Sequence, residues 1–452
     1  MRPRTKIVLV AIGMALAGVA WRVFSPGPPP GPLRYKLSVG DELVYEGQAT
    51  YPSGDRKTIE RTRLTVWVVA QNADGSWRMV MRSQRSSRRE AGFFEAARSG
   101  QEREGLEAFD LAADGRVKNS SIGVLGAPGS AVFFALPADD REAQAGWTIA
   151  EWTGDRLTHR LRPATWRDFG RRIIERRHGG LASEIRQATQ RVIATFEVKR
   201  GLVREVEFEA TPADASAGRM ELVSITGHGP EWPRQLAQEV EAFLETRALV
   251  REMERDRSLK LADTLKTADE LLRETRRGVQ LPVVAERLDA EIALVGNSAK
   301  WRVEQRAKED ALIGQPYPAW EITDLEGGKR ALADYRGRIV VLDFWSRNSS
   351  VGIWAMPQMK EVAAHYAGRP VTILGMNTDR DDAVARQAVE VLKPNYPTLK
   401  AQGLTAKLKL PNLPRLVIID QRGMVRELSI GFSETLRADL IKIVDRLLAE
   451  TP

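Results

Sequence analysis

Hydrophobic and polar residues alternate along the chain from about residue 35 to residue 230. Leu64, Val66 and Val68 share one parity, the segment 72–75 is rich in turn formers, and Met79 and Met81 resume the alternation. This arrangement predicts a β-hairpin, because the side chains of a strand point alternately to its two faces. We expect an antiparallel β-rich domain over residues 34–230, either a barrel or a sandwich. Similar runs predict further strands around residues 42–51, 109–111, 192–198 and 202–208.

Beyond Pro233 the hydrophobic residues follow a helical spacing within densely charged segments. Leu236, Val240 and Phe243 fall on one helical face, and comparable spacing continues toward Trp301. We expect a helical connector over residues 231–310, arranged as a hairpin or a small bundle. A coiled-coil partner surface is the alternative, although the heptads are not sustained.

Strands and helices alternate in the last part of the chain, over residues 311–452. Continuous apolar runs at 339–345 and 371–377 are typical of buried central strands, whereas 416–420 and 425–430 predict a hairpin. Apolar stripes on the segments 356–366 and 436–447 predict amphipathic helices. The fold class is therefore multidomain α+β, with a mixed α/β domain at the C-terminal end.

Six short motifs of this C-terminal domain occur in the order typical of one family. They are the segments 313–318 (IGQPYP), 325–327 (LEG), 335–338 (YRGR), 341–345 (VLDFW), 356–357 (MP) and 413–414 (LP). Together they resemble TlpA-like redoxins of the AhpC/TSA type, which are thioredoxin-fold proteins of the bacterial envelope. The resemblance implies a thioredoxin fold over about 135 residues and, for intact members, thiol–disulfide oxidoreductase activity.

The two cysteines of that family's Cys-x-x-Cys site are absent. Their positions hold Ser349 and Gly352, and Asn348 replaces the usual aromatic residue before the first cysteine. Thiol–disulfide exchange begins with attack by a thiolate, which neither a serine hydroxyl nor a glycine can form. The chain contains no cysteine at all, so it carries no residue able to perform this reaction.

Other residues of the same face match family positions or flank the lost site. By the resemblance, Asp343 corresponds to the buried acid of some thioredoxins and is expected to be an inherited buried carboxylate. Trp345 corresponds to the residue that ends the strand before the active site, and Pro414 to the cis-proline of a tight turn. Arg347 and Ser350 flank Ser349 at the start of a helix, which indicates either helix capping or an anion site. Ile353 and Trp354 are expected either on an exposed contact surface or buried under the sheet.

Residues for a substitute chemistry are lacking in the sequence. The single histidine of this domain, His365, follows Ser349 by sixteen residues along the predicted helix, more than four turns away, so a serine–histidine pair is not expected. His159, His178 and His228 lie elsewhere in the chain and show no metal-ligand spacing. We therefore assign no catalytic residue, metal or cofactor.

The formal charge of +8 reflects 68 basic and 60 acidic residues, and it is a modest excess. Arginine clusters at 82–89 and 171–177 lack the interleaved aromatic residues of nucleic-acid surfaces, so they predict solvated faces or weak attraction to anionic envelope surfaces. Basic residues precede an apolar run at 7–21, and a Pro/Gly linker follows at 25–33. Residues 1–24 thus predict a signal peptide, or a signal anchor held in the membrane by residues 7–21.

These observations lead to one hypothesis and two alternatives. The hypothesis is an exported protein, periplasmic or anchored facing the extracytoplasmic side, whose redox-inactive thioredoxin domain binds a protein or peptide partner or serves as a scaffold. The first alternative is a thiol–disulfide oxidoreductase whose cysteines come from a partner. In the second, the β-rich domain binds the ligand or an envelope polymer.

Overall fold

The computed structural model describes residues 33–450, except 54–55, 90–102, 120–131, 151–155, 164–169, 180–189, 211–215, 257–258, 348, 405–414 and 431–434. The predicted signal segment 1–24 and nearly all of the linker 25–33 lie outside this range. Within the described part of the chain, no helix is long and apolar enough to cross a membrane.

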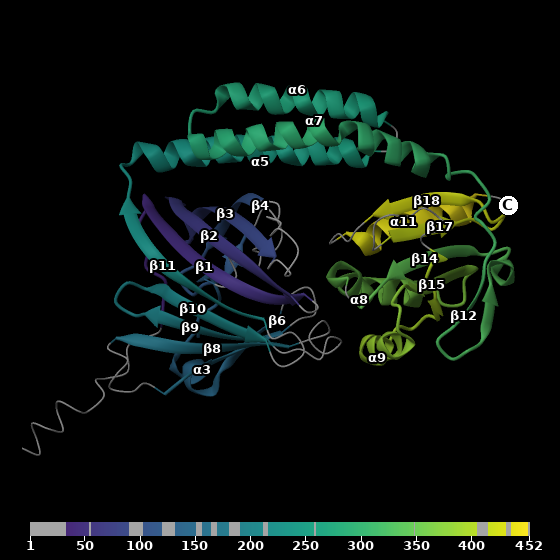
Figure 1. The fold of residues 1–452 in the computed structure, drawn as a ribbon, viewed down its shortest axis with the longest axis horizontal. Coiled ribbons are helices and arrows are strands. Elements are labelled where there is room, and N and C mark those ends of the chain that lie inside the picture. The colour runs from purple at the N-terminus through teal and green to yellow at the C-terminus, as the bar shows by residue number, and fades with distance from the viewer. Residues whose placement is uncertain are drawn as a thin grey trace, which may run out of the picture.

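The N-terminal half folds as a single antiparallel sheet (Figure 1). Its eleven described strands follow the order β5-β4-β3-β2-β1-β11-β10-β9-β8-β7-β6, and one short helix, α3 (Asp140–Ala145), precedes β6. The predicted antiparallel β-rich region is thus confirmed. The strands are β1 (Asp41–Ser53), β2 (Arg56–Gln71), β3 (Trp77–Arg89), β4 (Arg103–Leu111), β5 (Val117–Lys118), β6 (Trp147–Ala150), β7 (Arg156–Leu161), β8 (Arg171–Gly179), β9 (Gln190–Glu197), β10 (Leu202–Ala210) and β11 (Ala217–Gly227).

The hairpin predicted around residues 72–75 joins β2 to β3. The Asn72 N–H donates to the Ser76 carbonyl at 2.8 Å, and the Gly75 N–H donates to the Asn72 carbonyl at 3.0 Å. Gly75 has a φ of 81°, a conformation that glycine adopts without steric cost. The local sequence therefore determines this turn.

The pairing of β1 with β11 joins the two halves of the sheet. β1 pairs with β2 on its other side, so the first and last strands of the region lie together at the centre. Gly47 of β1 faces Met220 of β11, and a Cβ on Gly47 would lie 2.6 Å from the Arg219 carbonyl oxygen. The close approach of the two strands at this point requires glycine.

The sheet curves around one hydrophobic core. The segment 132–136 lies between the two ends of the sheet and makes hydrogen bonds to both. Leu136 donates its N–H to the Asp114 carbonyl at 2.7 Å on the β4 side, and Trp147 of β6 donates its indole N–H to the Ala135 carbonyl at 3.0 Å. Tyr35, which is buried, donates its hydroxyl to the Val132 carbonyl at 3.1 Å. The core inside the curve is thereby closed without strand pairing between β5 and β6.

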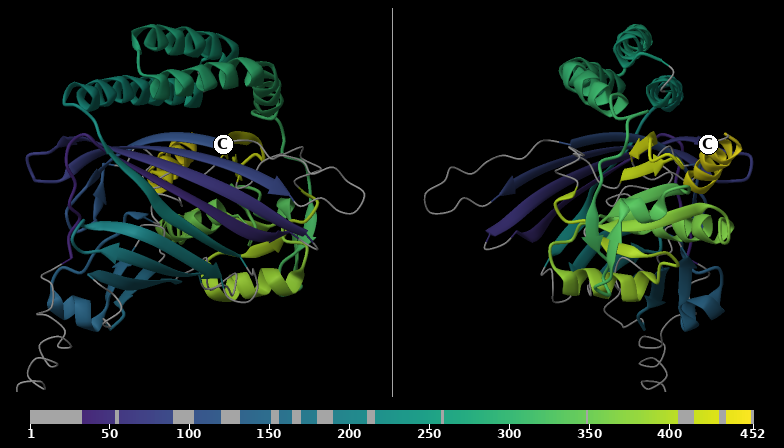
Figure 2. Two further views of the ribbon diagram at one scale, coloured as in Figure 1. Left: turned by 60° about the vertical axis from the view of Figure 1, so that its left-hand side comes forward. Right: turned by 90° about the vertical axis from the view of Figure 1, so that its right-hand side faces the viewer.

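Three helices cover part of the outer face of the sheet. They are α5 (Glu231–Arg255), α6 (Leu261–Gly278) and α7 (Pro282–Asp310), and Figure 2 shows them bundled above the long strands. Trp67, Val80 and Leu106 of the sheet share a buried cluster with Leu236 and Phe243 of α5. The region predicted as a connector is therefore a helical bundle that packs on the sheet.

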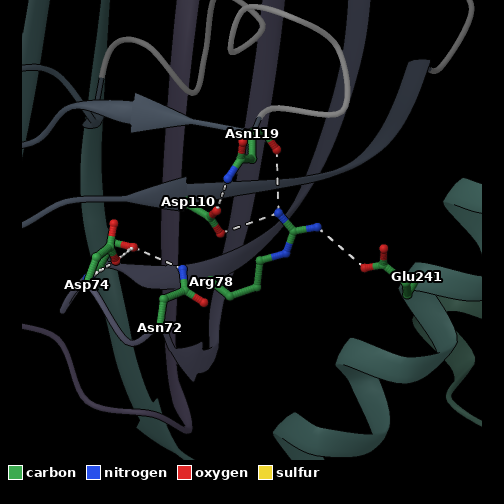
Figure 3. Close-up of polar contacts among 7 residues, drawn as sticks. Asn72, Asp74, Arg78, Asp110, Asn119 and Glu241 are labelled. Carbon is green, nitrogen blue, oxygen red and sulfur yellow. Dashed lines mark hydrogen bonds and ion pairs between the residues drawn. The ribbon is translucent and has the colours of Figure 1, made fainter.

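Arg78 links the outer face of the sheet to this bundle (Figure 3). Its guanidinium lies 3.4 Å from Asp110 on β4 and 3.4 Å from Glu241 on α5. Asn119 donates its side-chain amide to Asp110 at 2.6 Å, so the same carboxylate also holds the residue that follows β5. Asp110 is buried and its charge is balanced by Arg78, as the burial of a carboxylate requires.

The C-terminal part contains a five-stranded mixed sheet in the order β16-β15-β14-β17-β18. β14 is buried along its whole length, because helices and loops cover both faces of the sheet. All four predicted strands and both predicted helices are present. The elements are β12 (Glu321–Thr323), β13 (Lys329–Ala331), a 3₁₀ turn at Leu332–Tyr335, β14 (Ile339–Trp345), α8 (Ser350–His365), β15 (Val371–Asn377), α9 (Asp382–Leu392), β16 (Thr398–Lys400), β17 (Arg415–Ile419), β18 (Val425–Ile430) and α11 (Leu436–Ala449).

His159 is buried at the β6–β8 end of the large sheet. It lies opposite Trp147 on β6 and Arg176 on β8, and its ring stacks on Trp147 with centroids 5.1 Å apart. Burial, and then the charge of Arg176, lower the pKa of His159 to about 4. The histidine therefore remains neutral in the folded protein at neutral pH.

We predict that acid loosens this end of the sheet. Between about pH 6.5 and pH 4 the unfolded histidine takes a proton that the buried ring does not, so stability falls with falling pH by up to about 3 kcal/mol. Hydrogen exchange of the β6–β8 segment, corrected for intrinsic rates, should accelerate from pH 7 to pH 4.5. His159→Phe should remove this acceleration, whereas substitution of the exposed His365 should not. An unchanged pH dependence in His159→Phe would contradict the prediction.

Candidate functional site

The position of the lost first cysteine is the N-terminal end of α8. Ser349 is the N-cap of this helix, and its hydroxyl oxygen accepts the Gly352 N–H at 3.2 Å. A serine at this position satisfies one of the backbone donors that the first helical turn leaves unpaired. The structure thus shows Ser349 capping the helix, one of the two roles that the sequence indicates.

Gly352, at the position of the second cysteine, packs closely over Trp345 at the end of β14. A Cβ on Gly352 would lie 3.2 Å from the Trp345 Cβ and 3.3 Å from the Ser349 hydroxyl. Trp345 is completely buried. A larger residue at position 352 therefore requires a small shift of the first turn of α8 or of Trp345.

The loop between β14 and α8 is tied to the end of the neighbouring parallel strand. Arg347 donates its backbone N–H to the Asp379 carboxylate at 2.9 Å, and the Asn377 side-chain amide donates to the same carboxylate at 2.9 Å. Thr378 donates its N–H to the Trp345 carbonyl at 2.9 Å. Asp379 thus holds the loop at the carboxyl ends of β14 and β15, where α/β sheets commonly place their sites.

Asp343 lies on β14 on the side of the sheet that faces α8. Its carboxyl group is buried, with the Tyr396 hydroxyl 3.2 Å away, and that hydroxyl is also 2.8 Å from the Met356 sulfur. Burial raises the pKa of Asp343 to about 7, although the hydrogen bond from Tyr396 favours the charged form. No cation lies within ion-pair distance of this carboxylate among the described residues.

The remaining residues that the sequence predicts at this face differ in their burial. Ile353 is fully buried in the core beneath α8, which is one of the two placements expected for it. Trp354 is partly buried. Ser350 begins α8, but its side chain is not described, and Asn348 and Pro414 lie outside the described residues.

Sequence reasoning missed Tyr396 and Asp379. Tyr396 lies two residues before β16, and only the packing of that strand beside β15 brings its hydroxyl to Asp343. Asp379 had a usable signal, because Asn377, Thr378 and Asp379 follow a continuous apolar run. Polar residues directly after a buried parallel strand often line a site.

Nothing in the described residues completes a hydrolytic or metal centre at this face. His365 ends α8, at the opposite end of the helix from Ser349, and is exposed. No group of three or more His, Asp or Glu side chains able to hold a metal ion occurs in the described part of the chain. The arrangement offers a capped helix, a fixed loop and a buried carboxyl group.

Comparisons with known proteins agree with the fold of this region. Residues 313–428 match the model of the AhpC/TSA family. Thiol-disulfide oxidoreductase ResA of Bacillus thuringiensis (strain Al Hakam) is 32% identical over 132 residues, which cover 27% of this chain and 73% of that protein. Thioredoxin-like protein YneN of Bacillus subtilis (strain 168) is 25% identical over 147 residues, covering 31% of this chain and 85% of YneN.

A solved structure of a putative thiol:disulfide interchange protein DsbE from Chlorobium tepidum is 22% identical and covers 30% of this chain and 98% of its own, with a TM-score of 0.29. On its match to the family model and to ResA, the chain belongs to the AhpC/TSA family through its C-terminal region. The TlpA-like resemblance inferred from the motifs is confirmed. ResA is named for a chemistry that needs thiols, and this chain has no cysteine.

We predict that Asp343 makes the C-terminal domain less stable as the pH rises. Its pKa is about 7 in the folded protein and 3.8 in the reference state, so the folded protein binds more protons between these values. Stability should fall by up to about 4 kcal/mol from pH 4 to pH 7. Asp343→Asn should flatten this dependence, measured by hydrogen exchange of β14 and β15. An equally steep dependence in the variant would show that another group is responsible.

We also predict that Ser349 contributes stability as a cap. Ser349→Ala removes the acceptor for the Gly352 N–H and should destabilise the C-terminal domain by about 1 kcal/mol in urea unfolding. Thr435→Ala is the control, because Thr435 is the N-cap of α11 and makes no capping bond to the backbone; its hydroxyl donates instead to the Asp439 carboxylate at 2.8 Å, so this variant measures the loss of a hydrogen bond at a helix start that is not a cap. Equal losses in the two variants would argue against a capping role for Ser349.

Proposed function

We propose that this chain is an exported protein whose thioredoxin-like domain binds a protein or peptide partner and performs no redox chemistry. The observation that carries the proposal is the helix cap at Ser349, which occupies the position of the nucleophilic cysteine in a chain without any cysteine. A hydroxyl engaged with its own helix and lacking a base cannot replace a thiolate. We therefore expect the surface around Ser349 to bind a protein or peptide partner.

The bonds around this face support a binding role. Asp379 accepts the Arg347 backbone N–H just beyond the end of β14, and Ser349 caps the first turn of α8, so hydrogen bonds hold both of these residues in place. A site that is already ordered before binding loses less conformational entropy when a partner binds. We expect the partner to contact the surface around Arg347 and the start of α8.

Export is proposed from the N-terminal sequence. Arg2, Arg4 and Lys6 precede the apolar run 7–21, which has the pattern of a secretory signal or a signal anchor. The proposed location is the periplasm or the extracytoplasmic face of the membrane. Fractionation of cells that express a C-terminally tagged chain tests this, because retention of the tag in the cytosol would contradict export.

A thiol assay tests the absence of redox chemistry. In insulin reduction with dithiothreitol, the native chain should give no turnover above background, because it supplies no thiolate. The double substitution Ser349→Cys with Gly352→Cys should produce measurable turnover if the scaffold is preserved. Turnover by the native chain would overturn the proposal and support an oxidoreductase.

The crowding at Gly352 requires a steric control for that experiment. Ser349→Cys with Gly352→Ala adds a Cβ at the same tight position but no second thiol. Its unfolding midpoint measures the strain of the added Cβ, and its turnover should stay at background. Loss of stability in both double variants would assign an inactive Cys–Cys variant to misfolding.

Partner binding is tested directly by position-specific crosslinking. A photo-crosslinking residue at Arg347 in the full-length chain should capture a discrete partner in the native envelope. The same residue at Lys266, on the exposed side of α6, serves as the control. Identical capture patterns at the two positions would contradict recognition at the thioredoxin face.

A further inference from the structure

The large sheet is not continuous along the whole length of β11. This strand ends at Gly227, whereas its pairing with β10 ends at Glu221, so the six residues 222–227 pair with β1 alone. They have an unpaired edge in the middle of the strand order, where β11 continues past β10 toward α5 (Figure 1). The main-chain N–H and C=O groups that point to this edge therefore have no strand partner.

A β-bulge in each strand accounts for the separation of β10 from β11. The residue without a partner is Val223 in the β1–β11 pair and Arg204 in the β9–β10 pair. Arg204 is adjacent to Glu205, and Val223 follows Glu221 by two residues, and these two glutamates form the last β10–β11 pair. Because a bulge bends its strand and increases the local twist, two bulges at this point direct the strands apart.

The neighbouring segments leave the open edge of β11 unpaired. Before β1, Lys36 donates its N–H to the Gly201 carbonyl at 3.2 Å, so this part of the chain bonds to the start of β10. The Val203 carbonyl of β10 accepts the Tyr45 hydroxyl at 3.0 Å. Within the described part of the chain, residues 222–227 make no backbone hydrogen bond outside their ladder with β1.

The residues of this edge are uncharged and suited to strand pairing. The segment 222–227 has the sequence LVSITG, in which valine, isoleucine and threonine are β-branched. Val223 is 46% exposed and Ile225 is 42% exposed. Sheets commonly protect an open edge with charged residues, proline, a bulge or a covering segment. The bulge at Val223 is the one such feature that the described residues provide here.

The size and charge of the opening favour a short extended peptide over a second copy of the chain. Six residues of strand span about 20 Å. Pairing over that length supplies only a small part of the area of at least about 1,200 Å² that stable protein dimers bury. Arg204 is exposed where the strands separate, and no carboxylate lies within ion-pair distance of it among the described residues. It suits a peptide that carries an acidic group.

We propose that residues 222–227 bind an extended peptide segment of a partner protein, which adds a strand to the open edge of β11. Main-chain hydrogen bonds to β11 provide the affinity, and alternate side chains of the peptide provide the specificity. Apolar side chains lie beside Val223 and Ile225, and an acidic side chain or a C-terminal carboxylate pairs with Arg204. The N-terminal domain thereby has a binding site separate from the thioredoxin face and independent of the function proposed for it.

The probe is a synthetic peptide of alternating valine and threonine that ends in glutamate, added to the full-length protein. With a Kd of about 0.1 mM, about 1 mM peptide fills about nine-tenths of the sites. Hydrogen exchange of residues 222–227 should then slow about tenfold, because the added strand accepts and shields their edge amides. No slowing in this segment at that concentration would overturn the proposal.

Two N-methylated versions of the peptide separate strand addition from contact through side chains alone. Each has methyl groups on every second backbone nitrogen, in complementary patterns, so each loses the donors of one peptide edge while every side chain is kept. At least one pattern should abolish the slowing of exchange. Full binding by both peptides would show that no main-chain pairing occurs and would contradict strand addition, even if no protein variant folds.

Ile225→Lys should weaken binding of the peptide at least about tenfold, because it places a charge beside the apolar side chains of the added strand. Leu249→Lys is the matched control, since Leu249 is an apolar residue of α5 that is 46% exposed, and it should change the affinity less than twofold. Urea unfolding of both variants checks the fold. Equal weakening by the two substitutions would assign binding to net charge and overturn the proposal.

Arg204→Gln tests the acidic contact. In the native chain, the peptide that ends in glutamate should bind several-fold more tightly than one that ends in glutamine, and the substitution should remove this difference. An unchanged preference in the variant would exclude Arg204 from the site. Dimerisation of the native chain that Ile225→Lys abolishes, without any binding of peptide, would overturn the proposal in favour of a second copy.

Discussion

The pairing of β1 with β11 is the contact on which the N-terminal half of the structure depends. It joins β1–β5 to β6–β11 in one sheet, and it places β11 so that α5, which follows it, lies over β2. The close contact at Gly47 shows how little space this pairing leaves. Because helices α5 to α7 bury their apolar face on the outer side of this sheet, the pairing also determines which half of that side stays open and charged.

The C-terminal domain shows how a fold persists after its chemistry is lost. β14 is buried on both faces, and its packing against α8 and α11 depends on apolar side chains that do not require cysteines. Asp343 remains in this core, where its carboxyl group accepts a hydrogen bond from Tyr396, and its burial now weakens the domain at neutral pH. Ser349 caps helix α8 at the position that the nucleophilic cysteine occupies in the family.

The arginines of the large sheet differ more in their surroundings than their spacing along the chain suggests. Arg82 and Arg85 belong to one cluster in sequence, yet they have opposite parity on β3. Arg82 pairs with Glu104 and Glu286 and so links the sheet to α7, whereas Arg85 lies on the opposite face, which Met79 and Met81 share. A run of like charges along a strand is divided between two faces, and its function depends on the partners that each face supplies.

The sequence by itself determined the local elements: the β2–β3 hairpin, the buried strands of the thioredoxin-like domain, its family, and the loss of both thiols. Each of these depends on residues that are neighbours in the chain or on an ordered set of motifs. Only the tertiary structure decided that the β region is one sheet, that the helices pack on it, that Tyr396 reaches Asp343, and which arginines lack partners. These features join residues far apart in sequence, and a pattern of hydrophobic and polar positions shows that a face is buried without showing what buries it.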